Sequence, residues 1–368
     1  MKSPLYFQFE KILKQAKELG YPITKKESIL REFLQVKILE KIYQQKNSRF
    51  LFFVGGTSLR ILQDLDRFSE DLDFDYINLE TKDIEEIYKN VVFSLRQENI
   101  EVKTYKNLDK KPIEFELRFP KILYELGLSS YLSQNLVIKL DFDNFWKNLK
   151  AEIIQLEKFD VSEKIITIPK NQLLVQKLFA YLNRKQTLAR DIYDIVWLIS
   201  NDAKIDWDFL RVNKIDKNIK TKVLEKFLKD EKKLNILKKQ LEPLLLNTNS
   251  AKKIDNFKNY MLSAKNLIFE KFTIDEIGDV INYIFAFRLD TKEYKKILKF
   301  IIRVTGTAAV KITHDLPTSE LDNLKIEETV RKLLDFYDKN IIKDYQTKLV
   351  STLNVDHFRL SNLDCFLE

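Results

Sequence analysis

The chain has 368 residues and a formal net charge of +8, with 45% hydrophobic and 32% charged residues, a composition typical of a globular protein of about two domains. One cysteine, Cys365, and two histidines, His314 and His357, argue against disulfides, cysteine-based zinc clusters and histidine-rich metal sites, so any metal site must use carboxylates. No apolar run reaches membrane-spanning length and the first residues lack a signal peptide's apolar segment, so we expect a cytoplasmic protein.

Two amphipathic helices are predicted near the N-terminus, over 5–19 and 26–45, with Gly20-Tyr21-Pro22 as the break between them. The next apolar run, 50–54, is short and ends at a pair of glycines. Such a run is typical of a buried strand that enters a tight turn.

The glycine turn predicts a phosphate site. Gly55 and Gly56 let a ligand approach the backbone closely. Thr57 or Ser58 is placed to cap the helix that follows, and the free N–H groups and positive dipole end of a helix start attract anions.

Three aspartates then alternate with apolar residues over 71–76, so in a strand Asp71, Asp73 and Asp75 share one face. Two carboxylates about 4 Å apart repel by roughly 4 kcal/mol at an effective dielectric of about 20. A bound Mg²⁺ or Mn²⁺ removes that repulsion. In isolation the pattern is more typical of a solvated strand face, and the glycine turn upstream favours the metal site. We leave Asp75 out of the site, because it lies about 7 Å beyond Asp73.

The next elements are a helix followed by three strands, predicted over 83–97, 101–105, 113–119 and 136–143. In the last strand Asp141 and Asp143 share one side with Lys139. If this strand lies beside the first aspartates, Asp141 becomes a third metal-binding carboxylate. The alternatives are that Asp141 is a surface acid paired with Lys139, or that Asp143 takes its place.

A strand over 163–168 and a helix that starts near Pro169 follow, and a second helix runs over about 188–199. Asp191 and Asp194 share a face of the second helix. From Asp206 onward the pattern predicts mainly helices, with a loop or short strand at 307–310 and a helix over 319–339.

Most of the net positive charge lies in residues 211–240, which hold eleven Lys or Arg against four acids. One predicted helix face there carries a stripe of lysines, namely Lys222, Lys226, Lys229 and Lys233. Such a stripe suits a nucleic-acid phosphate backbone, but it equally suits a solvated face in a lysine-rich chain.

The string from Gly55 to Arg60, together with the string from Arg67 to Phe74, resembles the first motif of the AbiEii/AbiGii toxin family. These are DNA polymerase β-like nucleotidyltransferases of type IV toxin-antitoxin and phage-defence systems. The resemblance implies an α+β fold: a polymerase β-like core, in which helices flank a mixed sheet, and a mainly helical C-terminal domain. We place the nucleotidyltransferase domain with its N-terminal helices at 1–168 and the helical domain at 169–368.

Three later strings, 139–142, 173–180 and 189–195, resemble the family's second, third and fourth motifs. Carried over residue by residue, the resemblance implies metal binding by Asp71, Asp73 and Asp141, nucleotide binding by Gly55, Gly56, Thr57, Ser58, Arg67, Ser69 and Lys177, and catalytic roles for the three carboxylates, Lys177 and Asp191. Lys177 matches the lysine near the nucleotide phosphates, and Arg190 and Asp194 match neighbours of the helical acid.

The chain departs from the family pattern at Gln172, where the family usually has a glutamate, and this puts the orientation of Lys177 in question. Two structural alternatives also remain. Lys177 could extend from an apolar helix face to solvent, and Arg190 with Asp194 could form an ordinary i,i+4 ion pair.

The resemblance implies a Mg²⁺- or Mn²⁺-dependent transfer of a nucleoside monophosphate from a nucleoside triphosphate to an acceptor hydroxyl. We expect tRNA or another RNA as acceptor and a winged-helix antitoxin as genetic partner. The alternatives are a small-molecule nucleotidyltransferase of the aminoglycoside-modifying type and a non-catalytic nucleotide-binding regulator.

Overall fold

A computed structural model describes residues 3–262, 267–277, 280–290, 295–305 and 309–313 of the chain. Contacts between Cα atoms divide the chain into two compact units, 1–255 and 256–368. The domain division predicted at residue 168 falls inside the first unit and stays a prediction. The helix predicted over 319–339 lies outside the described residues, as do His314, His357 and Cys365.

The first unit is built on a five-stranded mixed sheet with the order β1-β2-β5-β4-β3. The strands are β1 (Leu51–Val54), β2 (Leu72–Tyr76), β3 (Lys103–Asn107), β4 (Ile113–Phe119) and β5 (Leu136–Asp143). β2 and β5 are parallel, whereas every other neighbouring pair is antiparallel. The predicted bounds of β4 and β5 are confirmed.

One face of this sheet is apolar because every second residue of its strands is apolar. Burial alternates strictly along β5, and Phe142 stacks on Phe74 of β2 with ring centroids 5.0 Å apart. Phe115 of β4 packs against Tyr88 of a covering helix at 4.4 Å. The carboxylates of β2 and β5 therefore lie on the opposite face.

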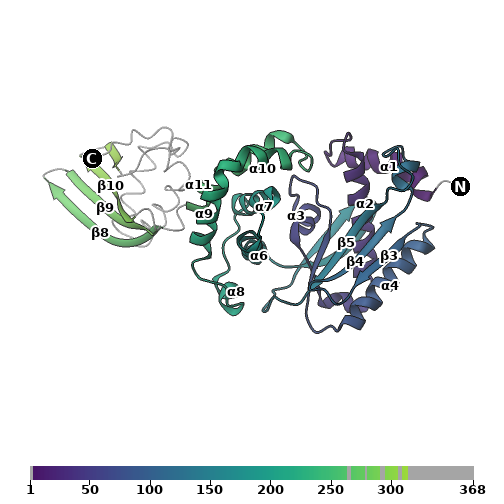
Figure 1. Ribbon diagram of the computed structural model, residues 1–368. Coiled ribbons are helices and arrows are strands. Elements are labelled where there is room, and N and C mark those ends of the chain that lie inside the picture. The colour runs from purple at the N-terminus through teal and green to yellow at the C-terminus, as the bar shows by residue number, and fades with distance from the viewer. Residues whose placement is uncertain (1–2, 263–266, 278–279, 291–294, 306–308, 314–368) are drawn as a thin grey trace. The chain divides into compact units, whose positions relative to one another are not determined.

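The apolar face is covered by helices that precede and interrupt the sheet. They are α2 (Lys26–Tyr43) and α4 (Thr81–Gln97), as predicted. The predicted α1 (Pro4–Glu18) packs against α2 and the short α5 (Ile122–Glu125), and the 3₁₀ segment η1 (Lys46–Phe50) lies beside α2 and α4. Figure 1 shows α4 along β3 and β4. The predicted α+β class, a mixed sheet flanked by helices, is confirmed.

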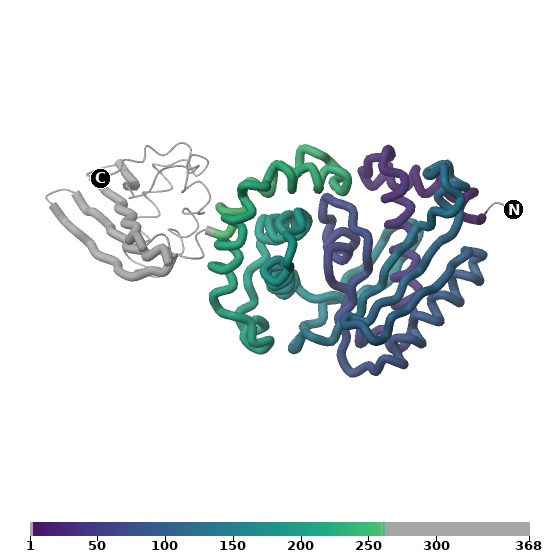
Figure 2. The backbone as a smooth tube through the Cα atoms, in the orientation of Figure 1, coloured from purple at the N-terminus to yellow at the C-terminus, as the bar shows by residue number. Residues whose placement is uncertain are grey.

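After the sheet the chain forms a hairpin and then a group of helices. The hairpin is β6 (Glu152–Lys158) with β7 (Val161–Thr167); β6 was not predicted. The helices are α6 (Lys170–Asn183), α7 (Ala189–Ser200), α8 (Trp207–Val212), α9 (Ile219–Asp230) and α10 (Leu234–Leu241), with η2 (Glu231–Lys233) and η3 (Thr248–Asn256). Figure 2 traces this group in teal and green, and α7 packs against both α6 and α10.

The second unit differs from the prediction of mainly helices after Asp206. After α11 (Phe257–Leu262) its described part forms an antiparallel sheet, β8 (Leu267–Ile277), β9 (Val280–Asp290), β10 (Lys295–Thr305) and β11 (Ala309–Thr313), in the order β11-β10-β9-β8. The helical prediction was therefore wrong for β8, β9 and β10, because these segments are rich in β-branched and aromatic residues, whereas the loop or short strand predicted at 307–310 overlaps β11. Within the described residues, no helix is long and apolar enough to cross a membrane.

Candidate active site

The glycine turn joins β1 directly to α3 (Gly55–Gln63). Gly55 has φ +79°, and a Cβ built on it would lie 2.8 Å from Cγ of Asp73. A Cβ on Gly56 would lie 2.5 Å from an Arg67 guanidinium nitrogen and 3.0 Å from Oγ of Ser69. Both glycines are required because the side chains of the first motif approach this turn more closely than a Cβ allows.

The predicted cap by Thr57 or Ser58 is wrong. The helix begins at Gly55 after Val54, without a side-chain cap, so both residues lie inside α3 and are fully buried. Thr57 donates a hydrogen bond to the carbonyl of Asp71, and the Ser58 hydroxyl lies 3.2 Å from that of Thr167. These hydroxyls fix the turn to neighbouring strands, while the first turn of α3 offers backbone N–H groups.

The carboxylates come together through the parallel register of β2 and β5. Asp73 pairs with Asp141, and Asp75 pairs with Asp143. Asp71 precedes β2 by one residue. The register thus places Asp141, not Asp143, beside Asp73.

A further acid of this face, Glu114, was missed by the sequence reading. β4 pairs antiparallel with β5, and Glu114 lies opposite Asp141. Lys110 and Lys139 form ion pairs with Glu114, and Lys139 also lies 3.6 Å from Glu116. The alternative of an Asp141–Lys139 pair is therefore replaced by pairs to glutamates. The alternation within 113–119 was the signal that places Glu114 on this face.

Burial and mutual repulsion raise the pKa values of the carboxylates on this face. Burial, followed by the charges of Asp73, Asp71 and Glu114, raises the pKa of Asp141 to about 7. Burial also raises the pKa of Asp73 and of Asp71. Oδ1 of Asp141 is buried without a hydrogen-bond partner.

The chemistry of these residues suits a divalent cation. Hard carboxylate oxygens, an unpartnered buried oxygen and mutual repulsion are the conditions that a divalent cation relieves. In the described part of the chain, no three His, Cys, Asp or Glu side chains are already grouped so that they could hold a metal ion. The donor set fits the cation, and the carboxylates would have to draw together around it.

Asp75 is held apart from this group. Its side chain is buried and accepts a hydrogen bond of 2.6 Å from Gln176 of α6. Burial, with smaller contributions from the charges of Asp143 and Asp73, raises its pKa to about 7. It thus links β2 to α6.

Lys177 of α6 is held by Asp194 of α7. Nζ of Lys177 lies 2.8 Å from Oδ2 of Asp194, and the Lys177 charge lowers the pKa of Asp73 against the effect of burial. Arg67 donates two hydrogen bonds, of 2.7 and 2.6 Å, to the same Asp194 carboxylate. Arg67 and Asp194 are almost fully buried, so this carboxylate fixes both cations near the glycine turn.

Asp191 lies one turn earlier on α7 and is also buried. Nε of Arg184 lies 3.0 Å from its carboxylate, and burial raises its pKa. Arg190 lies 3.8 Å from Glu70 rather than forming the alternative pair with Asp194. The structure therefore assigns the two acids of the fourth motif to different partners.

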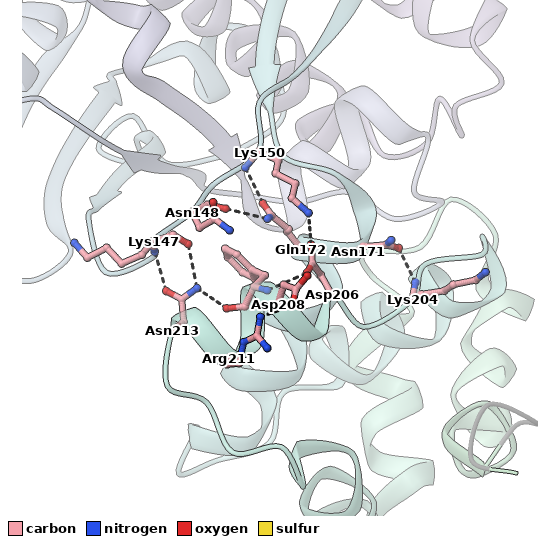
Figure 3. A network of polar contacts seen from close by, with 11 residues as sticks. Lys147, Asn148, Lys150, Asn171, Gln172, Lys204, Asp206, Asp208, Arg211 and Asn213 are labelled. Carbon is pink, nitrogen blue, oxygen red and sulfur yellow. Dashed lines mark hydrogen bonds and ion pairs between the residues drawn. The ribbon is translucent and has the colours of Figure 1, made fainter. Parts of the chain in front are cut away.

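Gln172 does not orient Lys177. Its buried amide donates to the carbonyl of Asn148 at 3.1 Å and accepts from the backbone N–H of Lys150 at 3.0 Å. Figure 3 shows this network, in which Lys150 also reaches Asp206. Gln172 ties the loop after β5 to α6, and the question raised by the missing glutamate is answered by Asp194.

The four lysines of the predicted stripe lie on α9 and, for Lys233, at the end of η2, and they differ in their contacts. Lys226 donates to the carbonyls of Tyr181 and Arg184 at the end of α6, at 2.6 and 2.7 Å. Lys222 pairs with Asp216 at 2.5 Å, while Lys229 and Lys233 are exposed. Lys226 thus has a structural role, and the other three face solvent at least in part.

Residues 37–312 match a family model described as "Nucleotidyl transferase AbiEii toxin, Type IV TA system". The match spans the glycine turn, both carboxylate strands and helices α6 and α7. The chain belongs to the AbiEii family. The predicted membership is confirmed, and the AbiEii family is one of nucleotidyltransferase toxins of type IV toxin-antitoxin systems.

Two solved structures from Helicobacter pylori are similar to this AbiEii chain. One is JHP933 and the other is a protein provisionally described as a nucleotidyltransferase; each is 17% identical with a TM-score of 0.39. Each alignment covers 64% of this chain, and they cover 91% and 94% of the respective relatives. A comparison with curated proteins gives no significant match.

Proposed function

We propose that this AbiEii-family chain is a metal-dependent nucleotidyltransferase, the toxin of a type IV toxin-antitoxin system. It transfers a nucleoside monophosphate from a nucleoside triphosphate to an acceptor hydroxyl. The observation that carries the proposal is the position of Asp73, which lies against the Gly55 turn and opposite Asp141. A phosphate-binding turn and a pair of carboxylates that suits a cation thus meet at one point.

In this proposal Asp71, Asp73 and Asp141 hold Mg²⁺ or Mn²⁺. The bound cation supplies Lewis-acid activation of the acceptor hydroxyl and neutralises charge on the departing pyrophosphate.

The remaining residues bind and orient the triphosphate. The backbone N–H groups at the start of α3 contact its phosphates, and the close approach at Gly55 and Gly56 keeps that surface open. Lys177, held by Asp194, places positive charge beside Asp73, where negative charge develops during transfer. Arg67 and Ser69 lie against Gly56 and so help to fix the shape of the glycine turn.

The test incubates the protein with Mg²⁺ and each nucleoside triphosphate, labelled at the α- or the γ-phosphate, together with total cellular RNA or lysate. We expect the α label, not the γ label, to appear on the acceptor and pyrophosphate to be released. Alanine at both Asp71 and Asp73 abolishes transfer and leaves the folded state intact. Transfer of the α label by that double variant would overturn the proposal.

RNA is the proposed acceptor class, supported by the exposed Lys229 of α9 and Lys233 of the adjoining η2. Reversing the charge of Lys229 and Lys233 should weaken RNA binding and flatten its salt dependence, as expected when phosphate contacts are lost. Arg211 and Asp208 form an exposed ion pair on α8, and charge reversal of Arg211 is the control. An unchanged salt slope in the α9 variant would remove this helix from the RNA-binding surface.

The proposed toxin role predicts a genetic partner, a winged-helix antitoxin, and a part in phage defence. Expression of the wild-type chain should stop growth, and the Asp71 and Asp73 double variant should not. Growth arrest by both proteins would separate toxicity from nucleotidyl transfer.

A further inference from the structure

The carboxylate face of the sheet continues past Asp141 onto strands β4 and β3. Two rows of side chains cross these strands in register: Asn107, Glu114 and Asp141 form one row, and Tyr105, Glu116 and Lys139 form the next. Residues paired across a sheet point to the same side. Tyr105, on the edge strand β3, therefore faces the same side as the candidate metal ligands.

The other side of β3 belongs to a different surface. Thr104 and Lys106 line a hollow of about 510 Å³ together with residues of α4. Because successive residues of a strand alternate between faces, this placement puts Tyr105 away from α4. The guanidinium of Arg118 lies 5.4 Å from the centre of the Tyr105 ring, which agrees with that orientation.

This surface combines an exposed ring with cations. Tyr105 is 43% exposed, and the side chains of Arg118 and Lys139 are each 42% exposed. Lys110, at the end of the β3–β4 hairpin, is half-exposed as well. We call this set, Tyr105, Lys110, Arg118 and Lys139, the β3–β5 platform.

The cations of the platform are held in place by acids. Arg118 donates two hydrogen bonds to Glu116, of 2.8 and 2.6 Å. Lys139 lies between Glu114 and Glu116, at 3.8 and 3.6 Å. Lys110 also pairs with Glu114, and these ion pairs restrict how far the cations beside the Tyr105 ring can move.

A preorganised aromatic ring with flanking cations is the chemistry that binds single-stranded nucleic acid, because bases stack on the ring and phosphates approach the cations. A strand spacing of about 4.8 Å and a rise of about 3.3 Å per residue put Tyr105 about 12 Å from Asp141. A short segment of single-stranded nucleic acid can span this distance.

We propose that the β3–β5 platform binds the single-stranded 3′ region of an RNA acceptor, with one base stacked on Tyr105 and the terminal hydroxyl directed toward Asp141. The proposal rests on the nucleotidyl transfer proposed above and names the acceptor surface of that same site. It places acceptor and triphosphate on opposite sides of the carboxylates, with the acceptor over β4 and the triphosphate over the glycine turn.

The experiment measures binding without turnover. A fluorescein-labelled single-stranded RNA with a free 3′ hydroxyl is titrated with wild-type protein and with Tyr105→Ala, Tyr105→Phe and Tyr124→Ala, and fluorescence anisotropy is recorded. Tyr124 is 50% exposed on α5 and serves as the matched control. Thermal unfolding confirms that each variant is folded.

We expect Tyr105→Ala to weaken RNA binding about tenfold, the loss of one stacked base, while Tyr105→Phe and Tyr124→Ala bind as the wild type does. The same RNA annealed to its complement should bind more weakly, because its bases are not free to stack. Wild-type-like affinity of Tyr105→Ala, or absence of RNA binding by the wild type, would overturn the proposal.

Failure of the platform and failure of the proposed reaction give different results. Label transfer to RNA with unchanged binding by Tyr105→Ala would overturn the platform and leave the nucleotidyltransferase intact. Loss of binding in Tyr105→Ala without any label transfer by the wild type would support the platform and overturn the reaction. Label transfer to a protein or a small molecule would overturn RNA as the occupant.

Discussion

The carboxylate of Asp73 occupies the space that a side chain on Gly55 would need, since a Cβ there would lie 2.8 Å from Cγ of Asp73. We predict that Gly55→Ala displaces Asp73 and abolishes label transfer. The variant should lose about 2 kcal/mol or more of unfolding free energy, from the left-handed backbone and from overpacking. Urea unfolding and label transfer measure the two effects.

Gly20→Ala is the matched control. Gly20 has φ +78°, close to that of Gly55, but nothing lies within 4 Å of a Cβ built on it. It should lose about 1 kcal/mol for the backbone alone and keep full transfer activity. Equal losses of activity in the two variants would show that the contact between Gly55 and Asp73 does not matter.

The carboxylate strands were predictable from local pattern, because alternation fixes which residues share a face. β5 was predicted with its observed bounds, and Asp141 with it. Whether Asp141 or Asp143 joins Asp73 depends on the register between two strands, which the sequence of either strand alone does not contain.

Asp194 is predicted to be essential for both folding and transfer. Asp194→Asn removes the charge that Arg67 and Lys177 share, which leaves the buried Arg67 uncompensated and should cost about 3 kcal/mol or more of unfolding free energy. Asp208→Asn, at the exposed pair with Arg211, should change stability little. Wild-type urea midpoints for Asp194→Asn would contradict this account.

The pairing of Asp194 with Arg67 could not be predicted from the sequence. Its partner Arg67 lies 127 residues away along the chain, whereas the local pattern suggested only Arg190, one turn before it. The prediction of a side-chain cap for α3 was wrong for a related reason. The positive φ of Gly55 and the packing of Asp73 against it start the helix at Gly55, two residues before Thr57.

A glutamate at position 172, which the resemblance to the family leads us to expect, should harm this protein. Gln172→Glu removes the N–H that bonds to the Asn148 carbonyl and sets a carboxylate oxygen against it, at a cost of about 1–3 kcal/mol. Gln155→Glu, at an exposed hydrogen bond to Ser162, is the control and should be nearly neutral. A stabilised or more active Gln172→Glu variant would mean that the loop network is not the reason for glutamine here.

Metal binding should change the pH dependence of stability. The pKa of Asp141 is raised in the folded state to about 7, so the folded protein holds this proton longer than the unfolded chain does. Without metal, its contribution to stability should therefore fall as pH rises from about 4 to about 7. Mg²⁺ binds the ionised form and should raise the melting temperature more at about pH 8 than at about pH 5.

Asp141→Asn has no carboxylate to titrate at this position and should weaken both effects, while Asp75, whose pKa is also raised to about 7, still titrates in the variant. Melting curves recorded with EDTA and with Mg²⁺ at the two pH values provide the measurement. A pH-independent Mg²⁺ shift, present equally in Asp141→Asn, would show that the cation binds elsewhere.

The most direct test of the central claim compares α-label transfer by Asp141→Asn and Asp143→Asn. The two acids are two residues apart on β5 and share one face, but only Asp141 lies opposite Asp73. Asp143 accepts hydrogen bonds from the backbone N–H groups of Asn144 and Phe145. We predict that Asp141→Asn lowers the transfer rate by a factor of about 100 or more and that Asp143→Asn stays within a few-fold of wild type. Equal rates for the two variants would contradict the proposed arrangement of carboxylates.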